Sequence, residues 1–125
     1  MIELEIPGRP VPWPRRVQTG RGKAFMPEPY RSWREAAQVY MQTAMSTAGQ
    51  EIISDYVHLK LVVFFEDHRR GDLDNYEKAV NNAAEGIILV NDKQVISVAK
   101  WLVLCPERPR VWVAYRTTEL EECEE

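Results

Sequence analysis

The sequence predicts an α+β fold in which a mixed β-sheet of about four strands carries two helices on one face. The chain has 125 residues, 45% of them hydrophobic and 28% charged, which is typical of one globular domain. Several short segments alternate apolar and polar residues, and two longer segments repeat apolar residues at helical spacing. The order strand, arm, helix, strand, helix, strand, strand is what places the strands in one mixed sheet.

Local patterns justify each element. Alternation at 2–6 indicates a half-buried strand, β-branched and aromatic residues at 56–66 indicate a second, and Gly49 and Gly86 are suitable helix ends. The expected elements are strands at 2–6, 56–66, 95–105 and 110–117 and helices at 30–48 and 73–85. Residues 106–109 are typical of a hairpin connection between the last two strands. The first helix is expected to bury Tyr30, Trp33, Ala37, Tyr40, Met41, Ala44 and Ala48.

The chain divides into one domain and a short tail. We expect residues 1–118 to form a single domain that includes an arm at 7–29, where prolines and glycines prevent long regular elements. Residues 119–125 hold five of the nineteen acids and no base, which predicts a disordered acidic tail. Without that tail, sixteen bases face fourteen acids, although the whole chain has a net charge of -3.

The composition also indicates where the protein works. No apolar run approaches the ~20 residues that a membrane span needs, and the first residues carry Glu3 and Glu5 where a signal peptide would be basic and then apolar. Cys105 and Cys123 are the only cysteines, which excludes a disulfide framework or a four-cysteine zinc site. We therefore expect a cytosolic protein with reduced thiols and no membrane partner.

Basic residues concentrate in the arm and the helix start that follows it. Between Arg9 and Arg34 there are seven bases, and Glu28 is the only acid. Clustered arginines bind phosphate well, because each planar guanidinium can make two hydrogen bonds. The other interpretation is an ordinary solvated segment. Trp13, Phe25 and Tyr30 lie among these bases and could either stack on DNA bases or pack within the protein.

The strongest chemical signal is Asp72-Leu73-Asp74 at the start of the second predicted helix. Two aspartates at i and i+2 can share a face in extended geometry and reach one hard cation. Lys78 lies one helical turn after Asp74 and points the same way. The simpler interpretations are that an aspartate caps the helix, that Asp74 and Lys78 form an i,i+4 pair, and that Asp92 caps a turn.

Three segments together resemble a known family. They are the arm at 7–16, the motif Asp72-Leu73-Asp74-Asn75 with Lys78, and Asn91-Asp92-Lys93-Gln94-Val95. In this order and at these separations, they resemble the RusA-like Holliday junction resolvases, small endodeoxyribonucleases of bacteria and their phages. The chain departs from some relatives at Gly71, where those relatives carry a basic residue directly before the first aspartate.

The resemblance implies a Mg²⁺-dependent enzyme, with Mn²⁺ as an alternative metal and no organic cofactor. It implies that Asp72, Asp74 and Asp92 bind the metal, that Lys78 assists, and that Asn75 and Gln94 support the motifs. It further implies a homodimer, bacterial or phage-encoded, that cuts four-way junction DNA symmetrically in recombination and repair. The residues expected to contact DNA are Arg9, Arg15, Arg16, Arg21, Lys23, Arg69, Arg70 and Lys93.

Geometry leaves the origin of the third aspartate open. A dozen-residue helix carries the chain about 18 Å away from Asp74, and residues 87–91 can just retrace that distance at about 3.3 Å each. Asp92 can therefore complete the site of its own chain, which we favour, or that of a partner.

Two carboxylates about 4 Å apart repel by roughly 4 kcal/mol at an effective dielectric of 20, and Lys78 is expected to offset part of this repulsion.

Two other functions stay compatible with the sequence. The first is a non-catalytic nucleic-acid-binding protein that keeps the fold. The second is a metal-dependent hydrolase of a small phosphate ester, which the basic arm and the lack of a glycine-rich phosphate loop disfavour.

Overall fold

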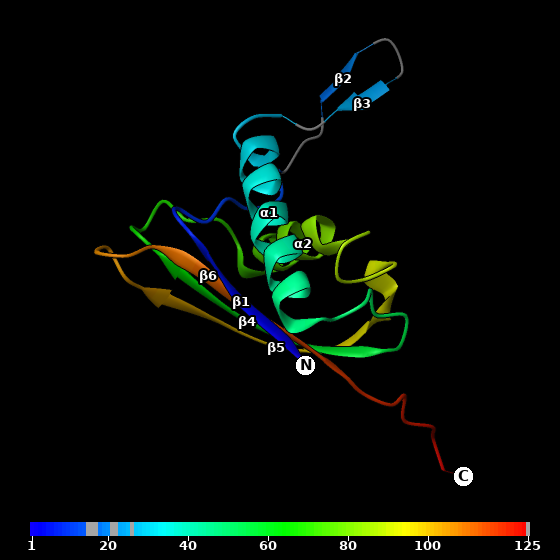
Figure 1. Ribbon diagram of the computed structural model, residues 1–125. Helices are drawn as coiled ribbons and strands as arrows, with labels where there is room; N and C mark the ends of the chain where they lie inside the picture. The colour runs from blue at the N-terminus through cyan, green and yellow to red at the C-terminus, as the bar shows by residue number, and fades with distance from the viewer. Residues whose placement is uncertain (15–17, 21–22, 26, 125) are drawn as a thin grey trace.

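A computed structural model describes residues 1–14, 18–20, 23–25 and 27–124, with only the backbone described at 18–20 and 23–25. Figure 1 shows the arrangement of the elements. In chain order they are β1 (Ile2–Pro7), β2 (Gln18–Gly20), β3 (Lys23–Phe25), α1 (Tyr30–Ala48), β4 (Val57–Phe65), α2 (Leu73–Ala84), the 3-10 helix η1 (Asp92–Gln94), β5 (Val95–Leu104) and β6 (Arg110–Thr117).

Four strands form the main sheet in the order β1-β6-β4-β5. β4 and β5 are parallel, whereas β6 runs antiparallel to both β1 and β4. Both long helices lie on one face of this sheet (Figure 1). The predicted α+β class, with a mixed sheet and two helices on one face, is therefore confirmed.

β4 is the centre of the core. Its residues Val57, Leu59, Leu61 and Val63 are completely buried beneath the helices, because successive side chains in a strand point to opposite faces. α2 connects β4 to the parallel strand β5, as a parallel pair requires a crossover connection. This β4-α2-β5 unit brings the start of α2 and the start of β5 to the same region of the molecule.

The predicted hairpin between the last two strands is wrong. β5 and β6 are not neighbours, because β4 lies between them and pairs with both. The connection at 106–109 instead passes the end of β4, where the Cys105 amide donates to the Phe65 carbonyl at 2.8 Å. The most apolar strand takes the middle position, where both of its edges are hydrogen-bonded and its inward face is buried. A short connection alone could not reveal this.

The first helix begins and ends where the pattern predicts, but its buried face is narrower. Tyr40 is 44% exposed, and Met45 is buried in its place. The core stripe steps from Ala37 to Met41 and Met45, and Tyr40 lies about 100° around the helix from Met41. Ala48 is also exposed. Gly49 ends the helix in the left-handed conformation, with φ of 62°.

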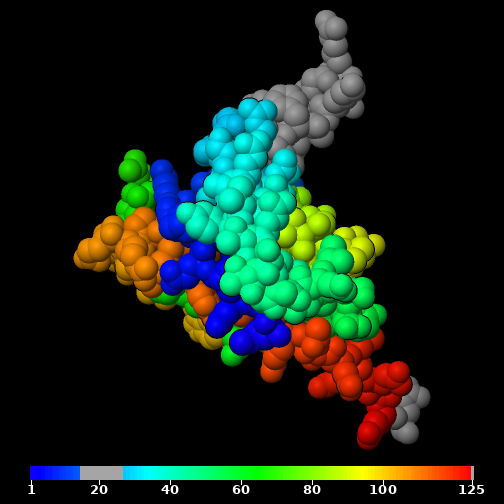
Figure 2. All heavy atoms as spheres, in the orientation of Figure 1, coloured from blue at the N-terminus to red at the C-terminus, as the bar shows by residue number. Residues whose placement is uncertain are grey.

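The arm and the tail leave the body at different ends. β2 and β3 pair as a short antiparallel ribbon beyond the N-terminal end of α1 (Figure 1). Residues 119–124 contain no helix or strand and are exposed, and Figure 2 shows them leaving the body at the end away from the start of α1. None of the helices in the described part of the chain is long and apolar enough to cross a membrane.

Candidate functional site

The predicted aspartate pair lies where α2 begins. Asp72 is the N-cap residue with an extended backbone, and Asp74 is in the first turn. The Asp72 side chain makes no capping hydrogen bond; instead, its backbone carbonyl accepts from the amides of Asn75 at 3.0 Å and Tyr76 at 3.2 Å. Both aspartates are exposed. Capping therefore does not occupy the carboxylate of Asp72.

A hollow of about 310 Å³ lies beside this helix start and is called the acidic hollow below. Its lining consists of Asp74, Glu77, Lys78, Asn81, Asp92 and Val95. Asp74 and Asp92 thus reach one hollow from a single chain, although 18 residues separate them in the sequence. Asp72 is not among the lining residues.

A buried amide holds the loop that carries Asp92. Gln94 Oε1 accepts from the backbone amides of Val90 and Asn91, each at 2.8 Å. Gln94 Nε2 donates to the carbonyls of Ile53 at 2.7 Å and Asp55 at 2.9 Å. Two of these hydrogen bonds hold the loop together, and the other two tie it to the segment before β4. Buried amides that are fully paired in this way restrict a loop to one position.

The short helix η1 has a cap of its own. Asn91 Oδ1 accepts from the Lys93 amide at 2.8 Å, and Gln94 completes a capping box. Asp92 is the first residue of η1, and its amide donates to Glu85 Oε1 at 3.3 Å. Because Asn91 does the capping, the carboxylate of Asp92 is not needed for it.

A lysine from β5 contacts two of the carboxylates that line the acidic hollow. The Lys100 ammonium contacts Asp74 and lies 2.6 Å from Glu77 Oε1. Lys100 pairs in register with the buried Leu61, so its side chain projects to the helix-covered face. Partial burial lowers the pKa of Lys100, but hydrogen bonds and charge from Asp74 and Glu77 outweigh this and raise the pKa overall. Lys100 is therefore a fixed cation beside these acids.

Asn81 connects the hollow to the core. Its Oδ1 accepts from the Tyr115 hydroxyl at 2.7 Å, and both residues are buried. Complete burial, followed by the charge of Glu77, raises the pKa of Tyr115. The hydroxyl therefore stays protonated and donates to Asn81. This contact anchors the middle of α2 to β6.

The arm docks directly on the start of α2. The Trp13 amide donates to the Asn75 carbonyl at 2.9 Å, and Lys78 Nζ lies 5.0 Å from the centre of the Trp13 ring. Trp13 also packs edge-on against Tyr30, with ring centres 5.4 Å apart. Tyr30 is buried and hydrogen-bonded to the Ala79 carbonyl. Trp13 and Tyr30 therefore pack against other residues of the protein.

The donor chemistry of the acidic hollow suits a hard divalent cation. Carboxylates of Asp74, Glu77 and Asp92 and the amide of Asn81 are oxygen ligands of the kind that Mg²⁺ prefers. Nevertheless, no three acidic, histidine or cysteine side chains within the described ranges are close enough together to hold an ion. Lys100 pairs with Asp74 in this arrangement.

Comparison with known proteins decides the family. The model of the family described as endodeoxyribonuclease RusA matches residues 7–116, nearly the whole chain. The chain belongs to the RusA endodeoxyribonuclease family. No curated protein matches the chain closely enough to add to this. The RusA match spans the arm, the start of α2 and the Asp92 loop, the three segments on which the resemblance rested.

The residues predicted to contact DNA in this RusA chain fall into two groups: those whose side chains the structure describes, and those whose side chains it does not describe. Arg9 pairs with Glu66 at 2.7 Å, and Arg69 pairs with Asp67 at 3.4 Å. Arg70 lies over the Phe65 ring at 5.5 Å, and Lys93 is exposed next to Asp92. Arg15, Arg16 and Arg21 lie outside the described residues, as does the side chain of Lys23.

Sequence reasoning missed two residues that line the acidic hollow, Glu77 and Asn81, and Lys100, which pairs with Asp74 and Glu77. Glu77 and Asn81 follow Asp74 at helical spacing, so helical periodicity could have found them. Lys100 had a weaker signal, because it is a charged residue at an inward position of a strand. The i,i+4 neighbour Lys78 was expected to offset the charge of Asp74, but Lys100 makes that ion pair and Lys78 lies over Trp13.

Proposed function

We propose that this RusA-family protein is a Mg²⁺-dependent endonuclease that resolves four-way DNA junctions by symmetric phosphodiester hydrolysis in recombination and repair. Membership of the family supports nuclease activity. The observation that carries the finer proposal is that Asp74, Asp92 and Lys78 line one hollow of a single chain. Carboxylates and a free ammonium side by side are what hydrolysis of a phosphodiester needs.

The proposed metal ligands are Asp74 and Asp92 in the acidic hollow, together with Asp72, which lies two residues before Asp74 in the chain. Mg²⁺ bound there would act as a Lewis acid on the scissile phosphate and make a water molecule more acidic. Mn²⁺ prefers the same oxygen ligands and is the alternative metal. The side chains of Asp72 and Asp74 are both exposed, so either can turn toward a cation without breaking buried contacts.

Lys78 is proposed to contact the scissile phosphate. Its ammonium is exposed at the acidic hollow and lies over the Trp13 ring, which restricts where the flexible side chain can go. A positive charge held at this place would stabilise the negative charge that develops on the phosphate. Trp13 would then act as a positioning residue for Lys78.

The proposed enzyme works as a homodimer. A monomer has one acidic hollow and would cut one strand in each encounter. A two-fold dimer presents two identical sites, which matches the two-fold symmetry of a four-way junction. Basic residues of the arm would contact the phosphates of the junction arms.

The test uses purified protein with Mg²⁺ and three substrates: a synthetic four-way junction, a linear duplex of matched sequence and a small phosphodiester. Paired cuts in the junction alone support the proposal. Binding to the junction without cleavage would instead indicate a non-catalytic DNA-binding protein. Rapid hydrolysis of the small phosphodiester, without junction cleavage, would indicate a small-substrate hydrolase.

A further inference from the structure

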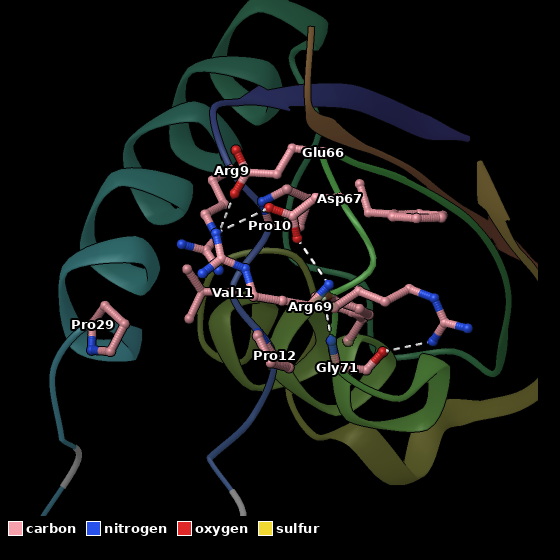
Figure 3. Close-up of a pocket in the computed structure, with 12 residues that line it drawn as sticks. Arg9, Pro10, Val11, Pro12, Pro29, Glu66, Asp67, Arg69 and Gly71 are labelled. Carbon is pink, nitrogen blue, oxygen red and sulfur yellow. Dashed lines mark hydrogen bonds and ion pairs between the residues drawn. The ribbon is translucent and has the colours of Figure 1, made fainter. Parts of the chain in front are cut away.

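A second concave region lies next to the start of α2, with Gly71 among its lining residues. This pocket of about 390 Å³, called the arm pocket below, forms between the first part of the arm and the turn after β4. Figure 3 shows its walls, with the arm residues facing the β4 turn across the opening. Its volume is within the range of small-molecule sites. Its apolar walls are Pro10, Val11, Pro12, Pro29 and Phe65.

The rim of the arm pocket carries three arginines, Arg9, Arg69 and Arg70. Two of them are already paired with carboxylates, Arg9 with Glu66 and Arg69 with Asp67. Arg70 has a different environment, because its guanidinium lies over the Phe65 ring and donates to the Gly71 carbonyl at 3.1 Å. Apolar walls together with arginines, of which Arg70 is not paired with Glu66 or Asp67, suit a ligand with a ring and attached phosphates.

The arm pocket and the acidic hollow have no lining residue in common, but residues next to each other in the chain connect their walls. Pro12 lines the pocket, and the next residue, Trp13, lies under Lys78 of the hollow. On the other side of the chain, Gly71 lines the pocket directly before Asp72. The Gly71 amide donates to the Tyr76 hydroxyl at 2.9 Å, which ties the pocket wall to α2. A DNA strand at the acidic hollow would therefore pass the mouth of the pocket.

We propose that the arm pocket receives one unpaired nucleotide of the DNA strand that is cut, next to the scissile phosphate. The base would lie between Phe65 and the prolines, and Arg70 would contact a flanking phosphate. Unpaired bases stack on apolar and aromatic side chains without regard to sequence. Nucleotides at a junction crossover are more easily unstacked than those in a duplex. The pocket would thus contribute to selection of junctions over duplexes, and it rests on the proposed nuclease function.

Arginines distinguish this ligand from an apolar peptide, since a nucleotide offers both a ring and phosphates. The close approach of Gly71 to Pro12 also keeps the pocket in one shape: a Cβ at residue 71 would lie 2.7 Å from Pro12 Cβ and Cγ. A rigid wall built from proline rings needs no ordering when a base enters, which favours binding.

The experiment combines two changes, one in the DNA and one in the protein. A series of four-way junctions carries an abasic site at each crossover-flanking nucleotide in turn, and binding is measured by fluorescence anisotropy in EDTA, without cleavage. The wild-type protein is compared with Val11→Trp, which fills the pocket. Val39→Trp on α1, where Val39 is 61% exposed, is the matched control.

We expect one abasic position to weaken binding of the wild type and of Val39→Trp by about tenfold, the size of one stacked base. Val11→Trp should bind the junction with this abasic position as tightly as it binds the intact junction. If every abasic junction affects all three proteins equally, the pocket proposal is wrong. Val11→Met fills less space and replaces Val11→Trp if the larger side chain lowers the unfolding temperature.

The outcome is separate from that of the proposed function. If the wild type neither binds nor cuts intact junctions, the nuclease proposal fails first. If it binds and cuts them while no abasic position distinguishes the pocket variant, only the nucleotide pocket is overturned.

Discussion

The acidic hollow and the arm pocket share the start of α2 but are built in opposite ways. In the hollow, buried hydrogen bonds hold the segments that carry the exposed carboxylates. These are the four hydrogen bonds of Gln94 and the bond between Asn81 and Tyr115. In the pocket, apolar rings form the walls and arginines paired with acids form the rim. One region holds charge in place with hydrogen bonds, and the other holds a shape with proline rings.

The difference shows what each region can tolerate. Hydrogen-bonded support fails when one partner is removed, because the buried groups that remain lose their partners. A wall of prolines fails when extra volume is added, because the rings cannot move aside by changing rotamer. Polar substitutions should therefore damage the hollow most, and added atoms should damage the pocket most.

The largest effect is expected from Asp74→Asn. The substitution keeps the shape of the side chain and removes its charge, so junction cleavage should fall by about 1000-fold or more while junction binding stays close to wild type. Gel assays of cleavage and anisotropy of binding measure the two separately. Asp72→Asn and Asp92→Asn should behave alike, whereas Asp55→Asn, outside the hollow, should cut normally. Undiminished cutting by all three site variants contradicts the assignment.

Gln94→Leu should produce the next largest effect. It removes the oxygen that accepts two hydrogen bonds and the amide group that donates two, and it leaves four backbone groups without their Gln94 partner, so we expect the free energy of unfolding to fall by about 3 kcal/mol. Urea denaturation measures this change. Gln50→Leu serves as the control, because Gln50 is exposed and its side-chain amide donates to the carbonyl of the adjacent Glu51. Equal stability of the two variants would show that Gln94 does not hold the Asp92 loop.

Gly71→Ala tests the wall of the arm pocket. The new Cβ would lie 2.7 Å from two Pro12 atoms, so the arm must shift, and we expect a loss of about 1–3 kcal/mol in unfolding free energy. A nearby comparison is Gly8→Ala, which meets nothing within 4 Å but has φ of +97° and should cost about 1 kcal/mol from backbone strain alone. Thermal unfolding of both variants shows which of them loses more stability. A smaller loss for Gly71→Ala than for Gly8→Ala would mean that the wall is soft.

The smallest effect concerns Lys100. Lys100→Met leaves Asp74 and Glu77 without their cation, so Mn²⁺ should bind about fivefold more tightly, the equivalent of about 1 kcal/mol for a partly exposed ion pair. Electron paramagnetic resonance of free Mn²⁺ measures this without any DNA. Lys60→Met, on the opposite face of β4, is the control and should bind Mn²⁺ as the wild type does. Weaker Mn²⁺ binding in Lys100→Met would show that the lysine does not compete with the metal.

Much of the fold was predictable because it depends on local periodicity. Alternation in 57–65 and helical spacing in 73–84 are visible in the chain and agree with the strands and helices observed. The order of strands was not predictable in the same way. Whether β6 pairs with β5 or with β4 depends on which strand has the most apolar surface to bury, and that is a property of the assembled sheet.

The candidate site shows the same division. Asp72, Asp74, Lys78 and Asp92 were named from motifs, and three of the four line one hollow. Asp72 is the exception, since it is not among the residues that line the hollow, whereas Glu77 is. Gln94 was named from its motif, and its buried side chain makes four hydrogen bonds at the Asp92 loop. Lys100 was not expected, because its partner Asp74 lies 26 residues earlier in the chain.

The sequence by itself determined most of the elements, the candidate residues Asp72, Asp74, Lys78 and Asp92, and the family to which the chain belongs. These depend on short-range spacing and on residue type, which the chain displays directly. The tertiary structure alone decided which strand lies at the centre, which lysine neutralises Asp74 and where the arm closes a pocket against the β4 turn. Such contacts join residues that are distant in the chain, and only the burial of one shared core brings them together.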